Sequence, residues 1–149
     1  MTSKVFGDTI SLSNEGSITN MQTTNFRGFT VTLSDVDTKK LDKAWKGASK
    51  HWRCIVYDKA NRKQMGFDVF GGSAATMSPL EALYCFCSDA WDYVNLDDAS
   101  DLCNEFGYDY PVGKQIYKKL EKAYFKCRKF IGSEDDILSI VNELREKFG

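Results

Sequence analysis

The stretch Ser78-Pro79-Leu80-Glu81-Ala82-Leu83-Tyr84-Cys85-Phe86-Cys87-Ser88-Asp89-Ala90-Trp91-Asp92-Tyr93-Val94 decides how this chain folds. Its start has the signature of a helix N-terminus: Ser78 as N-cap, Pro79 at the first helical position, and Glu81 completing a capping box. Apolar residues then recur at steps of three and four, and only a narrow strip through Asp89 and Asp92 is polar. We therefore expect a core helix.

The residues before this helix predict an antiparallel sheet. Residues 29–33 alternate apolar and polar side chains, as a half-buried strand does. Residues 52–57 and 64–70 alternate in the same way around a polar connection, which predicts a hairpin. A short basic helix is expected over residues 39–48. Residues 1–25, rich in Ser, Thr and Asn, are expected to form either an extra hairpin or a flexible arm.

Three further helices are expected after the core helix. The first is capped by Asp97 or Asp98 and ends at Gly107, with Phe106 facing inward. A long, lysine-rich helix covers residues 112–130, and the last helix runs from a second capping box to Phe148. The predicted fold is a single α+β domain over residues 1–149. It has a three-stranded antiparallel sheet, extended if the N-terminal hairpin forms, followed by a bundle of four helices.

Composition points to a cytoplasmic protein that does not enter membranes. The chain has 149 residues, a formal net charge of −1 and five cysteines, an odd number that fits reduced, buried thiols better than a disulfide framework. No apolar run approaches the roughly 20 residues of a spanning helix. The N-terminus also lacks the apolar region of a secretory signal.

No arrangement of residues predicts an active site. His51 is the only histidine, and Cys85 and Cys87 are two residues apart on a helix, so they cannot bind one metal together. The Gly71-Gly72 loop lacks the lysine of a phosphate-binding loop. We therefore expect no enzymatic activity, and no catalytic, cofactor or metal site.

Charge is distributed in blocks along the chain. Residues 39–63 carry nine Lys/Arg against two Asp, residues 81–109 carry eight Asp/Glu and no Lys or Arg, and residues 110–132 carry seven Lys/Arg against one Glu. Each block can be an ordinary solvated surface. The acidic block can instead present carboxylates to a basic groove on a partner protein, because such a groove reads spaced negative charge. The candidate partner-binding residues are Asp89, Asp92, Asp97, Asp98, Asp101, Glu105 and Asp109.

Residues 50–130 resemble small uncharacterised accessory proteins of bacteriophages and prophages. The similarity rests on Phe70-Gly71-Gly72-Ser73 after a hairpin, Ser88-Asp89-Ala90 in an apolar helix, and Glu105-Phe106-Gly107-Tyr108-Asp109. Pro111 departs from the polar residues that usually follow. The resemblance implies a phage gene of the kind that often encodes counter-defence proteins, including anti-CRISPR inhibitors, and it brings no catalytic residues.

These observations lead to one hypothesis and one alternative. The hypothesis is a non-enzymatic inhibitor of a bacterial defence system, acting in the cytoplasm of the infected host. It would bind a defence protein or complex directly, such as a nucleic-acid-binding effector. The alternative is a small nucleic-acid-binding module that uses the basic segment 39–63.

Overall fold

All three runs of alternating residues form strands in the computed structural model of the chain. The structure describes residues 18–36, 50–72 and 75–149. The chain divides into two compact units, and the boundary between Ala82 and Leu83 falls within the first helix. The first unit holds the sheet, and the second holds most of the helical residues. That residues 1–149 form one domain stays a prediction.

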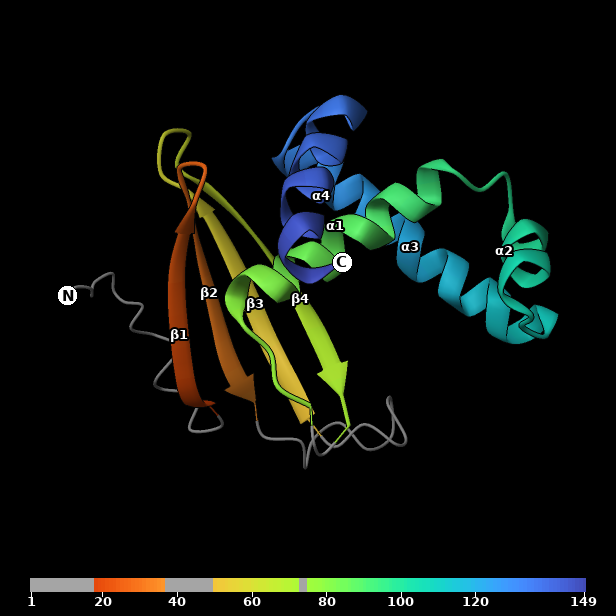
Figure 1. Cartoon of the computed structure of the whole chain (residues 1–149), viewed down its shortest axis with the longest axis horizontal. Coiled ribbons are helices and arrows are strands. Elements are labelled where there is room, and N and C mark those ends of the chain that lie inside the picture. The colour runs from red at the N-terminus through yellow and green to blue at the C-terminus, as the bar shows by residue number, and fades with distance from the viewer. Residues whose placement is uncertain (1–17, 37–49, 73–74) are drawn as a thin grey trace. The chain divides into compact units, whose positions relative to one another are not determined.

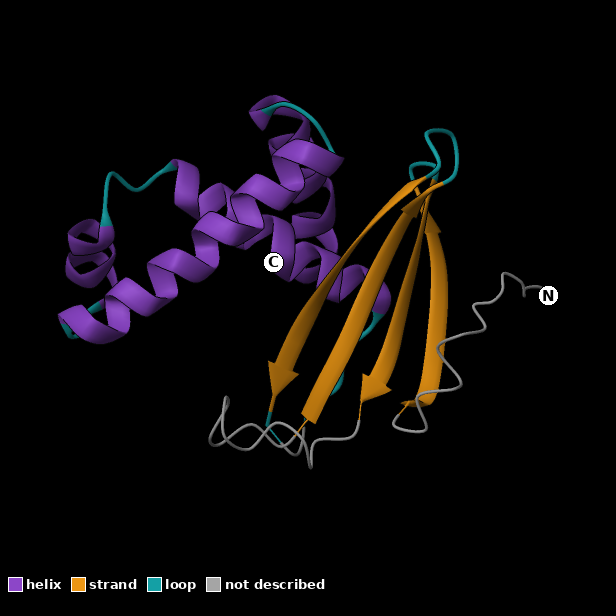
Figure 2. Ribbon diagram, turned by 180° about the vertical axis from the view of Figure 1, so that it is seen from behind, coloured by secondary structure: helices purple, strands orange, loops and turns teal. Residues whose placement is uncertain are grey.

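The sheet of the first unit has four antiparallel strands in chain order (Figure 1). The strands are β1 (Ile18–Phe26), β2 (Phe29–Val36), β3 (Lys50–Asp58) and β4 (Lys63–Gly71). The predicted hairpin is β3 and β4, joined by a turn in which the Asp58 carboxylate accepts hydrogen bonds from the backbone and side-chain nitrogens of Asn61. Figure 2 shows the sheet from behind.

The expectation of three strands is wrong, because β1 adds a fourth. Arg27 and Gly28 join β1 to β2 in a two-residue turn with φ of 51° and 83°. Two consecutive positive φ values suit the right-handed twist of a hairpin. Residues 18–25 are therefore strand and not an arm. The other half of the predicted N-terminal hairpin and the basic helix over 39–48 lie outside the described residues.

One face of the sheet is apolar and buried. The register aligns Leu33 with Cys54 and Cys54 with Phe67, and all three side chains are buried. The residues on either side of these three along their strands point to the opposite face. There Arg53 forms an ion pair with Asp68 at 3.2 Å. This period of two is what the sequence predicts for a sheet with a single apolar face.

The core helix is α1 (Pro79–Val94), and its N-cap is as predicted. The Ser78 hydroxyl accepts a hydrogen bond from the Glu81 backbone N–H at 3.2 Å. Leu83, Cys87 and Ala90 are buried. Cys85 is exposed, so the expectation that all the cysteines are buried is wrong at that position.

The helices α2 (Ala99–Phe106) and α3 (Tyr110–Phe130) are joined by a tight turn. Gly107 ends α2 in the left-handed conformation, with φ of 75°, as the sequence predicts. Leu102 of α2 packs with Leu120 of α3 and with Leu96 in one apolar cluster. Gly113 of α3 faces the Cys103 side chain so closely that a Cβ atom would collide with the sulfur.

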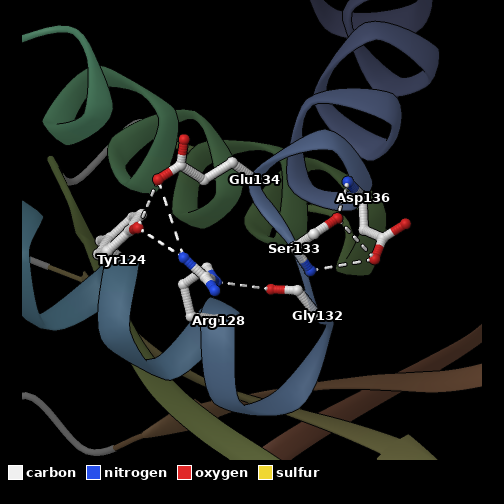
Figure 3. Close-up of polar contacts among 6 residues, drawn as sticks. All are labelled: Tyr124, Arg128, Gly132, Ser133, Glu134 and Asp136. Carbon is white, nitrogen blue, oxygen red and sulfur yellow. Dashed lines mark hydrogen bonds and ion pairs between the residues drawn. The ribbon is translucent and has the colours of Figure 1, made fainter.

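Polar contacts fix the junction between α3 and α4 (Glu134–Phe148) (Figure 3). Arg128 donates to the Gly132 carbonyl at 3.0 Å and to the Tyr124 hydroxyl at 2.9 Å. Tyr124 in turn donates to Glu134 at 2.6 Å. The predicted capping box is present, because the Ser133 hydroxyl accepts from the Asp136 N–H and the Asp136 carboxylate accepts from the Ser133 N–H.

Helical periodicity overestimated the core at two helix ends. Phe106 ends α2 with an exposed fraction of 55 %, and Phe148 ends α4 with 37 %. Both continue the apolar stripe of their helix. A stripe shows which side of a helix is apolar, but it does not show where the neighbouring element stops covering that side.

The close approach of α2 and α3 gives a first testable prediction. Gly113→Ala should destabilise the chain by about 1–3 kcal/mol because the new methyl group overlaps Cys103. Helix propensity alone predicts the opposite sign, since Ala favours a helix over Gly by about 1 kcal/mol. Chemical denaturation measures the free energy of unfolding.

The double variant Gly113→Ala/Cys103→Ala provides the control. Removing the sulfur makes room for the methyl group, so the double variant should be more stable than the sum of the two single changes by about 1 kcal/mol. Strict additivity would show that the two side chains do not meet.

Candidate functional site

The acidic candidates all lie in the second unit, on α1, on α2 and beside them. Asp89 and Asp92 belong to α1, and the other five follow between residues 97 and 109. The exposed ones are Asp92, Asp97, Asp98, Glu105 and Asp109, whereas Asp89 and Asp101 are half-buried. The chain from residue 64 to residue 113 contains no Lys or Arg. No basic residue of this segment therefore neutralises these carboxylates.

Two of the seven carboxylates stabilise the start of α2. Asp98 is the N-cap, and its side chain accepts a hydrogen bond from the Asp101 backbone N–H at 3.0 Å. The Asp101 carboxylate accepts from the Asp97 backbone N–H, also at 3.0 Å. These bonds satisfy backbone donors that a helix start leaves without partners. Asp98 and Asp101 therefore have a structural role whatever else they do.

Three carboxylates have no such role within the described part of the chain. The side chains of Asp97, Glu105 and Asp109 are exposed and form no hydrogen bond or ion pair with described residues. Asp109 occupies the N-cap position of α3 without capping it. These three side chains are available to a ligand, and changing them leaves the caps of α2 in place.

Asp89 differs most from the sequence prediction of a solvated strip. Burial raises the pKa of its carboxyl group from 3.8 to about 6, although Lys119 opposes the shift. Burial also raises the pKa of Asp92, with Arg145 opposing and Glu105 adding to the shift. Asp89 therefore loses its negative charge at a higher pH than an ordinary aspartate does. The spacing of apolar residues along the helix could not reveal that Asp89 is half-buried.

His51 and Cys54 do not form a nucleophilic Cys–His pair, because they lie on different faces of the sheet and His51 contacts a carboxylate. His51 Nε2 lies 2.8 Å from a carboxylate oxygen of Asp68, and its ring stacks on Phe70 at 4.7 Å. Cys54 is on the opposite, buried face, where burial raises the pKa of its thiol to about 12. A thiol of this kind is not a nucleophile at neutral pH.

The described residues contain neither a metal-binding cluster nor a membrane-spanning helix. Within residues 18–36, 50–72 and 75–149, no group of three or more His, Cys, Asp or Glu side chains could hold a metal ion. In this part of the chain no helix combines the length and the apolar character needed to cross a bilayer.

Part of the basic segment 39–63 is described. Residues 39–49 lie outside the described residues, Arg53 is paired with Asp68, and Arg62 and Lys63 are exposed at the turn between β3 and β4. The nucleic-acid-binding alternative at this segment stays a prediction.

Comparisons with known proteins add no relative. No model of a protein family matches the chain, and neither the curated proteins nor the solved structures give a match. The resemblance of residues 50–130 to phage accessory proteins therefore stays a prediction from the sequence.

The capping role of Asp98 can be tested against its neighbour. Asp98→Ala should destabilise the chain by about 1 kcal/mol, because the Asp101 N–H loses its acceptor. Asp97→Ala, the matched control, should change the free energy of unfolding by less than about 0.5 kcal/mol. Thermal unfolding of both variants measures the difference, and equal effects would contradict the assignment of the cap.

The burial of Asp89 predicts a pH dependence. Folding raises its pKa from 3.8 to about 6, so the folded state favours the protonated acid and loses stability as pH rises through that range. Asp89→Asn cannot ionise. At about pH 8 this variant should be more stable than the unchanged chain by on the order of 1–3 kcal/mol.

The comparison at low pH is the control for Asp89→Asn. Below about pH 3 the aspartate is largely protonated in both states, so the difference between the two proteins should vanish. A stability difference that stays constant from acid to alkaline pH would mean that ionisation of Asp89 is not its cause.

Proposed function

We propose that the chain is a non-enzymatic, phage-encoded inhibitor of a bacterial defence system, similar in action to anti-CRISPR proteins. It binds a defence protein directly through the acidic surface of α1 and α2. The observation that carries the proposal is a run from residue 64 to residue 113 without Lys or Arg, within which five of the seven candidate carboxylates are exposed.

The chemistry of carboxylates suggests what kind of partner fits. A protein that binds nucleic acid presents a groove of Lys and Arg side chains to spaced phosphates. Carboxylates held at intervals along a folded surface offer the same charge to that groove, and opposite potentials also speed the encounter. An effector of this kind would be blocked when the acidic surface occupies its nucleic-acid groove.

The ordered backbone of α2 supports such a contact. The cap of α2 fixes the carboxylates of Asp98 and Asp101 against the backbone, and Gly107 ends the helix at a defined point. Glu105 and Asp109 flank that end. Charges on an ordered backbone lose less conformational entropy on binding than charges on an unstructured tail.

The phage origin rests on the resemblance of residues 50–130 alone. It implies that the target is a bacterial protein and that the inhibitor works in the cytoplasm of the infected host. Both statements are parts of the proposal.

A plating assay tests the function. Bacteria with an active CRISPR system against a phage should regain efficient plating of that phage when they express the chain. The variant Asp97→Lys/Glu105→Lys should lose the effect, with target binding weakened on the order of a hundredfold, because two attractive charges become repulsive. Both positions lie outside the caps of α2, so circular dichroism should show an unchanged fold.

A control variant separates the effect of charge at the acidic surface from the effect of the net charge of the chain. Asp135→Lys/Glu146→Lys makes the same change in net charge at exposed positions of α4 and should keep full activity. If both variants fail alike, the acidic surface of α1 and α2 is not the contact. If the unchanged chain restores plating against no defence system, the proposed function is wrong.

A further inference from the structure

Positive charge in the second unit is concentrated on one face of α3. Lys114, Lys118, Lys122 and Lys129 are exposed, while Leu120, Ala123 and Cys127 are buried. At 3.6 residues per turn the four lysines lie on the side of the helix away from the buried stripe. None of the four forms an ion pair with the described residues.

An exposed aromatic ring lies on the same face. Phe125 has an exposed fraction of 57 %, the highest of the exposed large hydrophobic side chains in the described part of the chain. It is seven residues from Lys118 and four from Lys129, so it shares their side of the helix. Its ring is held at 5.2 Å from that of Tyr124 and 6.3 Å from that of Tyr93, which leaves its outer surface to solvent.

The carboxylate of α3 that lies nearest to these lysines is engaged in another contact and does not form an ion pair with them. Glu121 accepts a hydrogen bond from the Tyr93 hydroxyl at 3.3 Å and is half-buried. The face defined by Lys114, Lys118, Lys122, Phe125 and Lys129 is therefore positive, with one aromatic surface between the charges.

We propose that this lysine–aromatic face of α3 binds single-stranded nucleic acid. Lysines four residues apart are separated by about 6 Å along the helix axis, a spacing that lets each meet a phosphate of an extended strand. An exposed ring among them offers a surface on which an unpaired base stacks. A duplex keeps its bases stacked on one another and cannot use Phe125 in this way.

The exposed ring of Phe125 favours nucleic acid over an acidic protein as the occupant. Lysines alone serve either partner, whereas a flat ring exposed between them matches a base, and such stacking tolerates any base sequence. The proposal uses none of the candidate carboxylates of α1 and α2, so it does not depend on the proposed inhibitor function.

Fluorescence anisotropy with a labelled oligothymidylate of about 12 nucleotides tests the proposal. Binding should be measurable at about 50 mM salt and should weaken steeply by about 200 mM. Four lysine–phosphate contacts predict a slope of log affinity against log salt of about −2.8. Lys118→Gln/Lys122→Gln should reduce the size of that slope by about 1.4.

Two matched controls separate the site from bulk charge. Arg145→Gln/Lys147→Gln makes the same charge change at exposed positions of α4 and should leave the slope unchanged. Phe125→Leu keeps an apolar side chain but removes the ring, and should weaken binding about tenfold without changing the slope. Phe106→Leu removes an equally exposed ring, beside Glu105, and should have no effect.

Four results would overturn the proposal. The first is no binding of the oligonucleotide at about 50 mM salt, and the second is an equal loss of slope in the two double variants. The third is an equal effect of Phe125→Leu and Phe106→Leu on affinity. The fourth is a duplex that binds as tightly as the single strand. Circular dichroism of each variant confirms that it is folded, so every anisotropy result bears on the site itself.

Discussion

The close contact of Gly113 with the Cys103 side chain is the constraint on which the helical unit depends. It lets α2 and α3 approach until Leu102 and Leu120 join one apolar cluster with Leu96. Any side chain at position 113 would push the two helices apart. The cap by Asp98 at the start of α2 and the left-handed Gly107 at its end then fix the short helix between α1 and α3.

This arrangement separates charge that nearly cancels in the chain as a whole. The formal net charge is −1, yet the carboxylates of α1 and α2 and the lysines of α3 occupy different elements of one unit. Two surfaces of opposite charge on one small unit fit a target that contains both a basic protein and a nucleic acid. The proposals for the acidic surface and for the lysine–aromatic face are consistent with such a target, and each stands on its own residues.

Sequence patterns predicted the helices well because their signals are local. Ser78, Ser133 and Gly107 mark helix ends, and the apolar stripes of α1 and α3 follow the helical period. Sequence left β1 undecided between a strand and an arm, because it is rich in Thr and Asn and has no clear apolar alternation. Its signal was the Arg27-Gly28 turn, which only a search for hairpin turns would have found.

For the acidic site, sequence could identify charged residues but not their environments. Burial of Asp89 and capping by Asp98 and Asp101 depend on backbone geometry. Phe106 lies on the apolar stripe of α2 and Phe125 lies off that of α3, yet both are more than half exposed. The candidate surface is therefore smaller than the sequence implied, with Asp97, Glu105 and Asp109 as its available carboxylates. The most direct test is hydrogen–deuterium exchange of the chain in complex with the defence protein that we propose it inhibits. The account predicts slowed exchange of the backbone amides from Asp97 to Asp109. Unchanged exchange there, with protection confined to the sheet, would contradict it.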